Sequence, residues 1–240
     1  MQSKDQSRDA RWARAGGAAS FLLAAVLVAA VALRAGASSV TDTVGENQAY
    51  LSDLAHNRGQ AVTAVWLMGA ASLLMAVAFA GLYYGLRRWG EDSMRIALAA
   101  GLSAAVLNVG RVAAQAAVVG HIVPEWGVSP NALRRAVLQS SFRTIEWLSI
   151  ATESAFQVAL SVAMAAAGLV MLRIGRRWRG PAGLAFAGAA AGLVGALRPV
   201  ETALSYGALV QVAALALWML WLAVGLQTIG GEGDADTRPE

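Results

Sequence analysis

Residues 146–172 read EWLSIATESAFQVALSVAMAAAGLVML, an apolar run interrupted by only a few polar side chains. Its length exceeds the roughly 20 residues that an α-helix needs to cross about 30 Å of hydrocarbon. Five further apolar runs reach or approach this length: residues 16–34, 62–86, 94–120, 181–198 and 203–227. The sequence therefore predicts an all-α polytopic membrane protein, folded as a bundle of six transmembrane helices.

The composition supports this class. Hydrophobic residues make up 57% of the chain and charged residues only 14%, whereas soluble domains carry about 25% charged residues. The net charge of +4 does not indicate nucleic acid as a partner, because the arginines flank the apolar runs as membrane-boundary charges do. Membrane lipid is therefore the expected partner of the apolar helix surfaces. The absence of cysteine excludes disulfides and thiolate metal sites.

Charge bias between the segments predicts the orientation. With the N-terminus inside, twelve lysine and arginine side chains fall in cytoplasmic segments and six in outer segments, while Arg111 lies within the membrane. Such an excess is typical of the cytoplasmic side. We therefore expect a multi-pass protein of the bacterial plasma (inner) membrane with both termini cytoplasmic.

Two chain ends need separate interpretation. The first run has a basic lead and an AGA tripeptide at 35–37 that resembles a signal-peptide cleavage site, but it exceeds the 7–15 apolar residues of a signal sequence. An uncleaved helix is the expectation. At the other end, residues 230–240 read GGEGDADTRPE, which predicts a disordered cytoplasmic tail after a single transmembrane domain over 1–229.

The second outer loop, residues 121–145, contains a short amphipathic helix pattern. Ser129 can cap this helix, Pro130 suits its first turn, and Leu133, Val137 and Leu138 share an apolar face. The pattern predicts a short helix lying on the outer membrane surface. A lid over an outward-facing cavity is the alternative.

The sequence lacks the residue motifs that several kinds of catalysis and cofactor binding require. There is no HExxH zinc motif, GxSxG elbow or P-loop, and the only lysine, Lys4, lies outside the apolar runs. His56 and His121 belong to outer segments, where two solvated histidines are expected rather than a metal site with loop carboxylates. We predict no catalytic residue, metal or cofactor.

Polar residues instead follow one face of the third and fourth predicted helices. The third carries Asn108, Arg111 and Gln115, and the fourth carries Glu146, Ser149, Glu153, Gln157 and Ser161, in each case at helical spacing. A charge at the centre of a membrane helix costs about 2.5–3.5 kcal/mol, so these groups should face the bundle interior and find partners. The stripe is either a polar cavity or relay near the midplane, or a structural contact that sets helix register.

The depths of two charged residues in the membrane predict an ion pair within this stripe. Arg111 and Glu153 each lie ten residues from the expected outer boundary, or about 15 Å below it. The two side chains should therefore face each other. The same register sets Asn108 opposite Gln157 and Gln115 opposite Ser149.

Glycines in the fifth run indicate close helix packing. Gly188 and Gly192 form a GxxxG spacing, which lets two helix backbones approach each other. The spacing serves packing within the protomer or, alternatively, the seam of a homodimer.

The pattern resembles an uncharacterised bacterial family of six-helix membrane proteins, domain of unknown function 4386. The resemblance rests on AGLYYGLRR at 80–88, on RVAAQ at 111–115, and on MLRIGRRWRGPAGLAFAGAAAGL followed by LALWMLWLAVGL in the last two helices. It implies the fold and no catalytic residues.

Three functions remain open. The polar stripe favours a small transporter or permease-like protein with a polar site between the third and fourth helices. The second hypothesis is an accessory or scaffold subunit that packs against a larger membrane partner. The third is an intramembrane enzyme that uses Glu153 or Glu146 as an acid or base.

Overall fold

The computed structural model describes residues 2–38, 46–129, 131–197 and 205–235, and the side chains of 2–6, 205, 206, 208 and 230–235 are excluded from the description. These residues form helices throughout, with short 3₁₀ or π turns between some of them. The elements in chain order are α1 (Gln2–Ala37), α2 (Asn47–His56), α3 (Arg58–Leu86), η1 (Arg87–Trp89), α4 (Glu91–Ala117), η2 (Val118–Ile122), α5 (Val123–Val128), α6 (Ala132–Ile174), η3 (Arg176–Trp178), α7 (Arg179–Gly195) and α8 (Ser205–Ala235).

Five helical segments of the described chain are long and apolar enough to cross a membrane. They are Ser7–Ala37, Arg58–Trp89, Glu91–Val128, Ala132–Ile174 and Leu209–Ile229. The sixth predicted span is α7, which the structure describes over 17 residues, or about 25 Å of helix. The chain is therefore an all-α, multi-pass, membrane-embedded protein.

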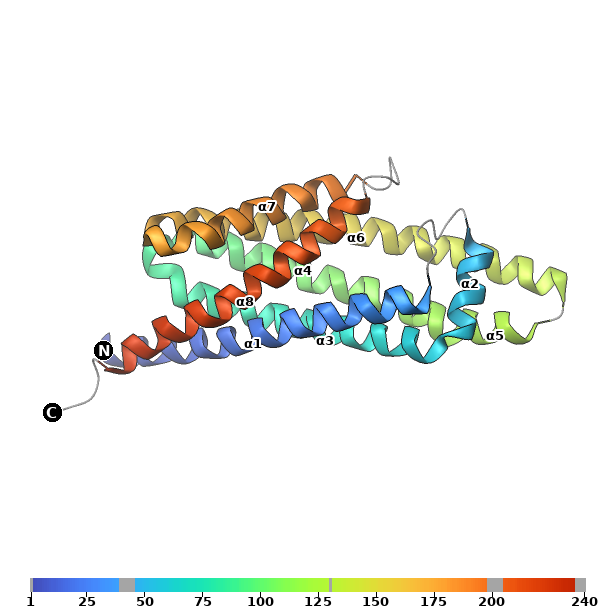
Figure 1. The fold of residues 1–240 in the computed structure, drawn as a ribbon, viewed down its shortest axis with the longest axis horizontal. Coiled ribbons are helices and arrows are strands. Elements are labelled where there is room, and N and C mark those ends of the chain that lie inside the picture. The colour runs from blue at the N-terminus through green and yellow to red at the C-terminus, as the bar shows by residue number, and fades with distance from the viewer. Residues whose placement is uncertain (1, 39–45, 130, 198–204, 236–240) are drawn as a thin grey trace.

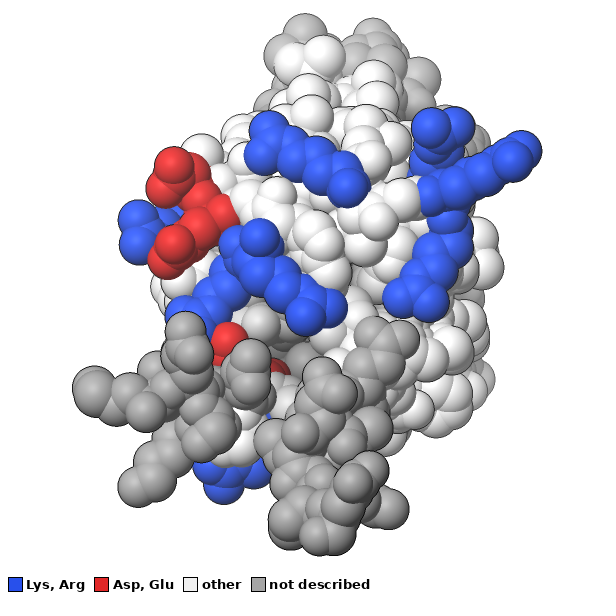
Figure 2. Space-filling view, turned by 90° about the vertical axis from the view of Figure 1, so that its left-hand side faces the viewer, with Lys and Arg blue, Asp and Glu red and all other residues white. Residues whose placement is uncertain are grey.

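The six long helices form a closed ring. Each packs mainly against two others, in the circular order α1, α3, α4, α6, α7 and α8, with α8 returning to α1. The start of α1, the end of α8 and the Arg-Arg-Trp turns η1 and η3 lie at one end, and α2, α5 and the start of α6 lie at the other (Figure 1). We call these the basic end and the cap end. Arginines dominate the surface of the basic end (Figure 2).

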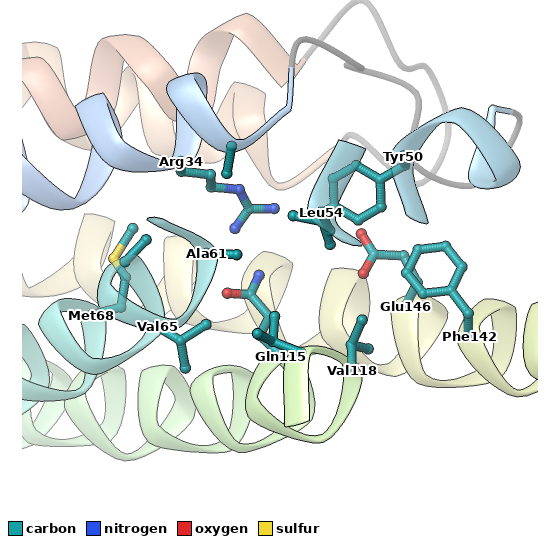
Figure 3. A pocket seen from close by; sticks show the side chains of 13 residues that line it. Arg34, Tyr50, Leu54, Ala61, Val65, Met68, Gln115, Val118, Phe142 and Glu146 are labelled. Carbon is teal, nitrogen blue, oxygen red and sulfur yellow. The ribbon is translucent and has the colours of Figure 1, made fainter. Parts of the chain in front are cut away.

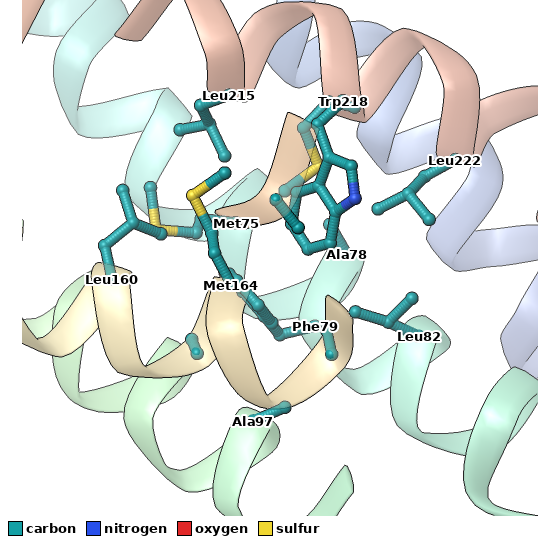
Figure 4. Close-up of a cluster of buried hydrophobic side chains, with 14 of the residues drawn as sticks. Met75, Ala78, Phe79, Leu82, Ala97, Leu160, Met164, Leu215, Trp218 and Leu222 are labelled. Atoms are coloured by element: carbon teal, nitrogen blue, oxygen red, sulfur yellow. The ribbon is translucent and has the colours of Figure 1, made fainter. Parts of the chain in front are cut away.

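Large apolar side chains fill the middle of the ring. Phe79 of α3 packs against Trp218 of α8 with ring centroids 6.2 Å apart, and Met75 and Met164 complete a layer in which every member is at most 1% exposed (Figure 4). This layer separates the two ends of the bundle.

Glycine permits the closest helix crossing, between α1 and α3. A Cβ atom built on Gly81 would lie 2.3 Å from the Cα atom of Gly16, so the two backbones touch. The predicted GxxxG pair is also used within the protomer. Gly188 faces Met164 and Ala214, and Gly192 faces Ser161 and Gln211.

The prediction of a separate surface helix in the second outer loop is wrong. A single helix, α6, runs for 43 residues from Ala132 to Ile174. No glycine or proline lies between Ala132 and the apolar run, so nothing interrupts the backbone hydrogen bonds. Asn131, rather than Ser129, caps the helix by accepting from the amides of Leu133 and Arg134. At about 64 Å, α6 is twice as long as the hydrocarbon is thick.

Residues 230–235 of the predicted disordered tail are helical in the structure. Helix α8 continues to Ala235, because each residue added to an existing helix gains a hydrogen bond at little further cost. The rest of the predicted tail, residues 236–240, lies outside the described residues, as does the predicted end of the fifth run at residue 198.

The α1–α3 crossing predicts that Gly81→Ala destabilises the bundle. The added methyl meets backbone atoms that cannot turn away, and overpacking of this kind costs about 1–3 kcal/mol. Gly183→Ala is the matched control, because nothing lies within 4 Å of its Cβ position and alanine favours a helix. Thermal unfolding in detergent should show a lower midpoint for Gly81→Ala only. Equal midpoints for the two variants would contradict the crossing.

Candidate functional site

The predicted polar stripe lies inside the ring, but it does not form one continuous site. Asn108, Arg111, Glu146, Ser149 and Gln157 are buried. Gln115 and Glu153 are partly buried. The residues closer to the apolar middle layer are bonded to neighbouring helices, whereas Gln115 and Glu146 line a cavity at the cap end.

The predicted ion pair between α4 and α6 is confirmed. Arg111 Nη1 lies 3.8 Å from Glu153 Oε1, and the two side chains are 8% and 18% exposed. Asn108 orients the guanidinium by accepting a hydrogen bond from Arg111 Nε at 3.2 Å. The pair joins two antiparallel helices at one depth, as the register predicted.

Asn108 and Gln157 are both buried, as the predicted layer requires, but the side-chain amide of Asn108 donates its hydrogen bonds to α3. Asn108 Nδ2 donates to Ser72 Oγ at 2.8 Å and to the carbonyl of Met68 at 3.3 Å, both on α3. The carbonyl of Gln157 accepts from Ser161 Oγ at 2.7 Å.

A second buried contact joins α6 to α8. Gln211 Nε2 donates to Ser161 Oγ at 3.2 Å and to the Gln157 carbonyl at 3.4 Å. These hydrogen bonds hold α3 and α8 to the central pair of helices, which is the structural interpretation of the stripe.

The cap-end cavity is the strongest candidate for a ligand site. Figure 3 shows the guanidinium of Arg34 and the carboxylate of Glu146 directed into it, with Gln115 and Tyr50 beside them. Its interior leaves about 30 Å³ for the centres of water molecules, enough for one or two of them. Apolar side chains such as Val65 make up most of the remaining wall.

The positive and negative charges in and beside the cavity are equal in number. Arg34 forms a side-chain hydrogen bond with Tyr50 and interacts with the charges of Glu146 and Glu153. Together with Arg111, the cluster holds two cations and two anions. A buried group of charges is stable only when it is paired in this way.

Helix α2 contributes Tyr50 and Leu54 to the wall of the cavity. The helix is fixed by polar contacts on its other faces: Trp126 Nε1 donates to Ser52 Oγ at 3.2 Å, and Gln139 of α6 donates to Asn47. A second apolar cluster around Leu51, Trp126 and Phe142 lies beneath it. The cap end therefore has an apolar cluster of its own, separate from the middle layer.

The helix that runs from α4 into α5 changes its winding beside the cavity. Residues Val118–Ile122 form the π turn η2, and Val118 and Val119 line the cavity wall. Such single-turn widenings of an α-helix are rare and are frequently found at functional sites. This feature supports the cavity as the site.

Sequence reasoning missed Arg34, Tyr50, Ser72 and Gln211. Arg34 was assigned to a solvated outer segment, but it lies in the last turn of α1 and faces the interior. Gln211 carried a usable signal, since a lone amide in an apolar run needs a buried partner. His56 and His121 are both exposed.

No protein-family model, curated protein or solved structure matches the chain. The resemblance to the six-helix family therefore stays a prediction. The geometry defines the class: a membrane-embedded helical bundle with a charge-balanced polar cavity at one end. Within the described residues, no three or more His, Cys, Asp or Glu side chains are grouped to hold a metal.

The ion pair predicts a strongly non-additive mutant cycle. Arg111→Leu or Glu153→Leu alone leaves an unpaired charge, and breaking a buried pair in this way costs about 3–5 kcal/mol. The double variant should recover most of that loss, because it leaves no charge behind. Free energies of unfolding from denaturant titration in mixed micelles measure the coupling. A double variant as unstable as the sum of the single ones would contradict the pairing.

Proposed function

We propose that the chain spans the plasma membrane six times with both termini in the cytoplasm. The positive-inside rule supports this orientation, since the basic end carries an excess of arginine (Figure 2). Its described arginines are Arg8, Arg11, Arg14, Arg87, Arg88, Arg95, Arg173, Arg176, Arg177 and Arg179. Arg34 strengthens the bias, because it faces the cavity and is not a free charge of the cap end.

The function that the site supports best is that of a small transporter or permease-like protein. It binds a small polar solute at the cap-end cavity, which faces outward in this orientation. The opposed side chains of Arg34 and Glu146 are the observation that carries this proposal. Helix packing alone does not require two charged side chains to line a cavity. Charged residues inside a membrane protein are costly and commonly mark a functional site.

The cavity also indicates the class of solute. Its single cation and single anion give a lone ion no net attraction, whereas a zwitterion can meet both charges at once. Gln115 and Tyr50 add hydrogen-bonding groups. The present volume admits only water, so binding a solute requires the cavity to widen.

A second function, an accessory or scaffold subunit, is favoured by the middle of the bundle. The layer around Phe79 and Trp218 leaves the two ends separated (Figure 4). The polar residues next to it, Asn108 and Gln211, are bonded to other helices. A protein that only binds solute or a larger membrane partner needs no route through this layer.

The orientation predicts a pattern of cysteine labelling, which is easily read in a chain without cysteine. Gln48→Cys on α2 should react with a membrane-impermeant maleimide in intact cells, because Gln48 is exposed at the cap end. Asp92→Cys, whose carboxylate is 94% exposed at the basic end, should react only after permeabilisation. The reverse pattern would overturn the proposed orientation.

The cavity predicts selective uptake of a zwitterion by proteoliposomes. In an osmotic swelling assay with glycine, acetate, methylammonium and glycerol, glycine should enter fastest relative to protein-free liposomes. Glu146→Gln should remove that preference, because losing a charged hydrogen-bond partner costs about 1.5–3 kcal/mol, or roughly tenfold or more.

Glu125→Gln is the control for this assay, since Glu125 pairs with Arg134 on the surface, away from the cavity. It should behave as the wild type does. If no solute enters faster than in protein-free liposomes, transport is refuted and the accessory function stands.

A further inference from the structure

A groove of about 490 Å³ lies on the surface at the basic end, between the turn η3 and the last turns of α8. Among the described residues, Arg177 is its only charged lining residue. Most of its wall is apolar and consists of Leu217, Leu220, Trp221 and Val224. It is separate from the cap-end cavity and shares no residue with it. The polar network described above does not account for it.

The lining changes from apolar to polar along the direction of α8. This helix runs toward the basic end (Figure 1), so Leu217 is the deepest lining residue and Thr228 the nearest to that end. They are 11 positions apart, or about 16 Å. Leu217, Leu220 and Val224 are 56%, 43% and 66% exposed. The groove therefore has an apolar deep part and a cationic outer part.

Two tryptophans and one glycine form the floor of the groove. Trp178 and Trp221 meet edge to face with ring centroids 4.7 Å apart, and a Cβ atom on Gly225 would lie 2.9 Å from both rings. Just before Trp178, Gly175 has a φ angle of 141°, which glycine adopts more readily than other residues. The chain can then bury Trp178 at 1% exposure while leaving Arg177 on the surface. The local sequence is thus arranged to form this groove.

We propose that the groove binds one anionic phospholipid of the leaflet at the basic end. Its phosphate lies at Arg177 and one acyl chain lies along Leu217, Leu220 and Val224. The groove and the lipid agree in charge and in the position of their parts. A phospholipid in a bilayer has its anionic group at the membrane boundary and its acyl chains further in, and the groove has its arginine and its apolar wall in the same order. Basic pockets beside membrane helices recognise anionic headgroups in this way, and tryptophans favour the same depth. A free phosphate would leave the apolar wall unused.

Native mass spectrometry of the full chain in detergent tests this site. The protein is incubated with phosphatidylglycerol or phosphatidylcholine of identical acyl chains. Wild type should retain phosphatidylglycerol in preference, and Arg177→Ala should lower that retention about fivefold, the effect of one basic side chain near the membrane surface. Arg88→Ala is the control, because Arg88 lies at the same end but stacks on Trp89.

A second pair of variants tests the apolar wall. Val224→Trp fills the groove and should reduce the retention of phosphatidylglycerol. Val210→Trp places the same residue on the same helix, at a valine that is 56% exposed outside the groove, and should not. Millimolar inorganic phosphate should displace no lipid.

Thermal unfolding of each variant separates loss of binding from loss of folding. The proposal is overturned if wild type retains the two lipids equally, if Arg177→Ala changes nothing, if both tryptophan variants act alike, or if inorganic phosphate displaces the lipid. The test does not depend on the cap-end cavity or on any solute.

Discussion

The pairing of Arg111 with Glu153 constrains the rest of the bundle. A charge within a membrane-spanning helix costs several kcal/mol unless it is paired, so α4 and α6 can meet only in the register that brings these groups to 3.8 Å. That register in turn places Asn108 beside α3 and Gln157 beside α8. The ring of helices follows from contacts that the central pair presents on its two sides.

A consequence is the unequal character of the two halves of the bundle. Charges and amides gather between the ion pair and the cap end, where Arg34 and Glu146 complete a neutral set. The middle, around Met164 and Trp218, is filled by apolar side chains. The polar half holds a cavity to whose wall α2 contributes Tyr50 and Leu54, and both α2 and α5 pack against α6.

The sequence predicted the helices and the ion pair well, because hydrophobic length and helical spacing determine both. It did not predict that Arg34 would face inward, since the inward side of α1 depends on which helices flank it. The partners Ser72 and Gln211 were missed for the same reason: ring order is a tertiary property that spacing within one helix does not contain. The merged helix α6 was missed because the short amphipathic pattern was expected to end before residue 146, although no glycine or proline interrupts the helix there.

Packing in the middle layer determines what the cap-end cavity can do. A solute that enters at Arg34 must pass Phe79 and Trp218 to reach the basic end, and rigid rings of this size cannot move aside without rearranging their neighbours. The neighbours include Met75 and Met164, whose flexible side chains adapt to new packing more readily than branched ones. The α1–α3 crossing at Gly16 and Gly81 has no interlocking side chains at its contact, and α1 carries Arg34. Movement of α1 along α3 would therefore alter the cavity and the apolar layer together, whereas a rigid α1 confines the protein to binding at one face.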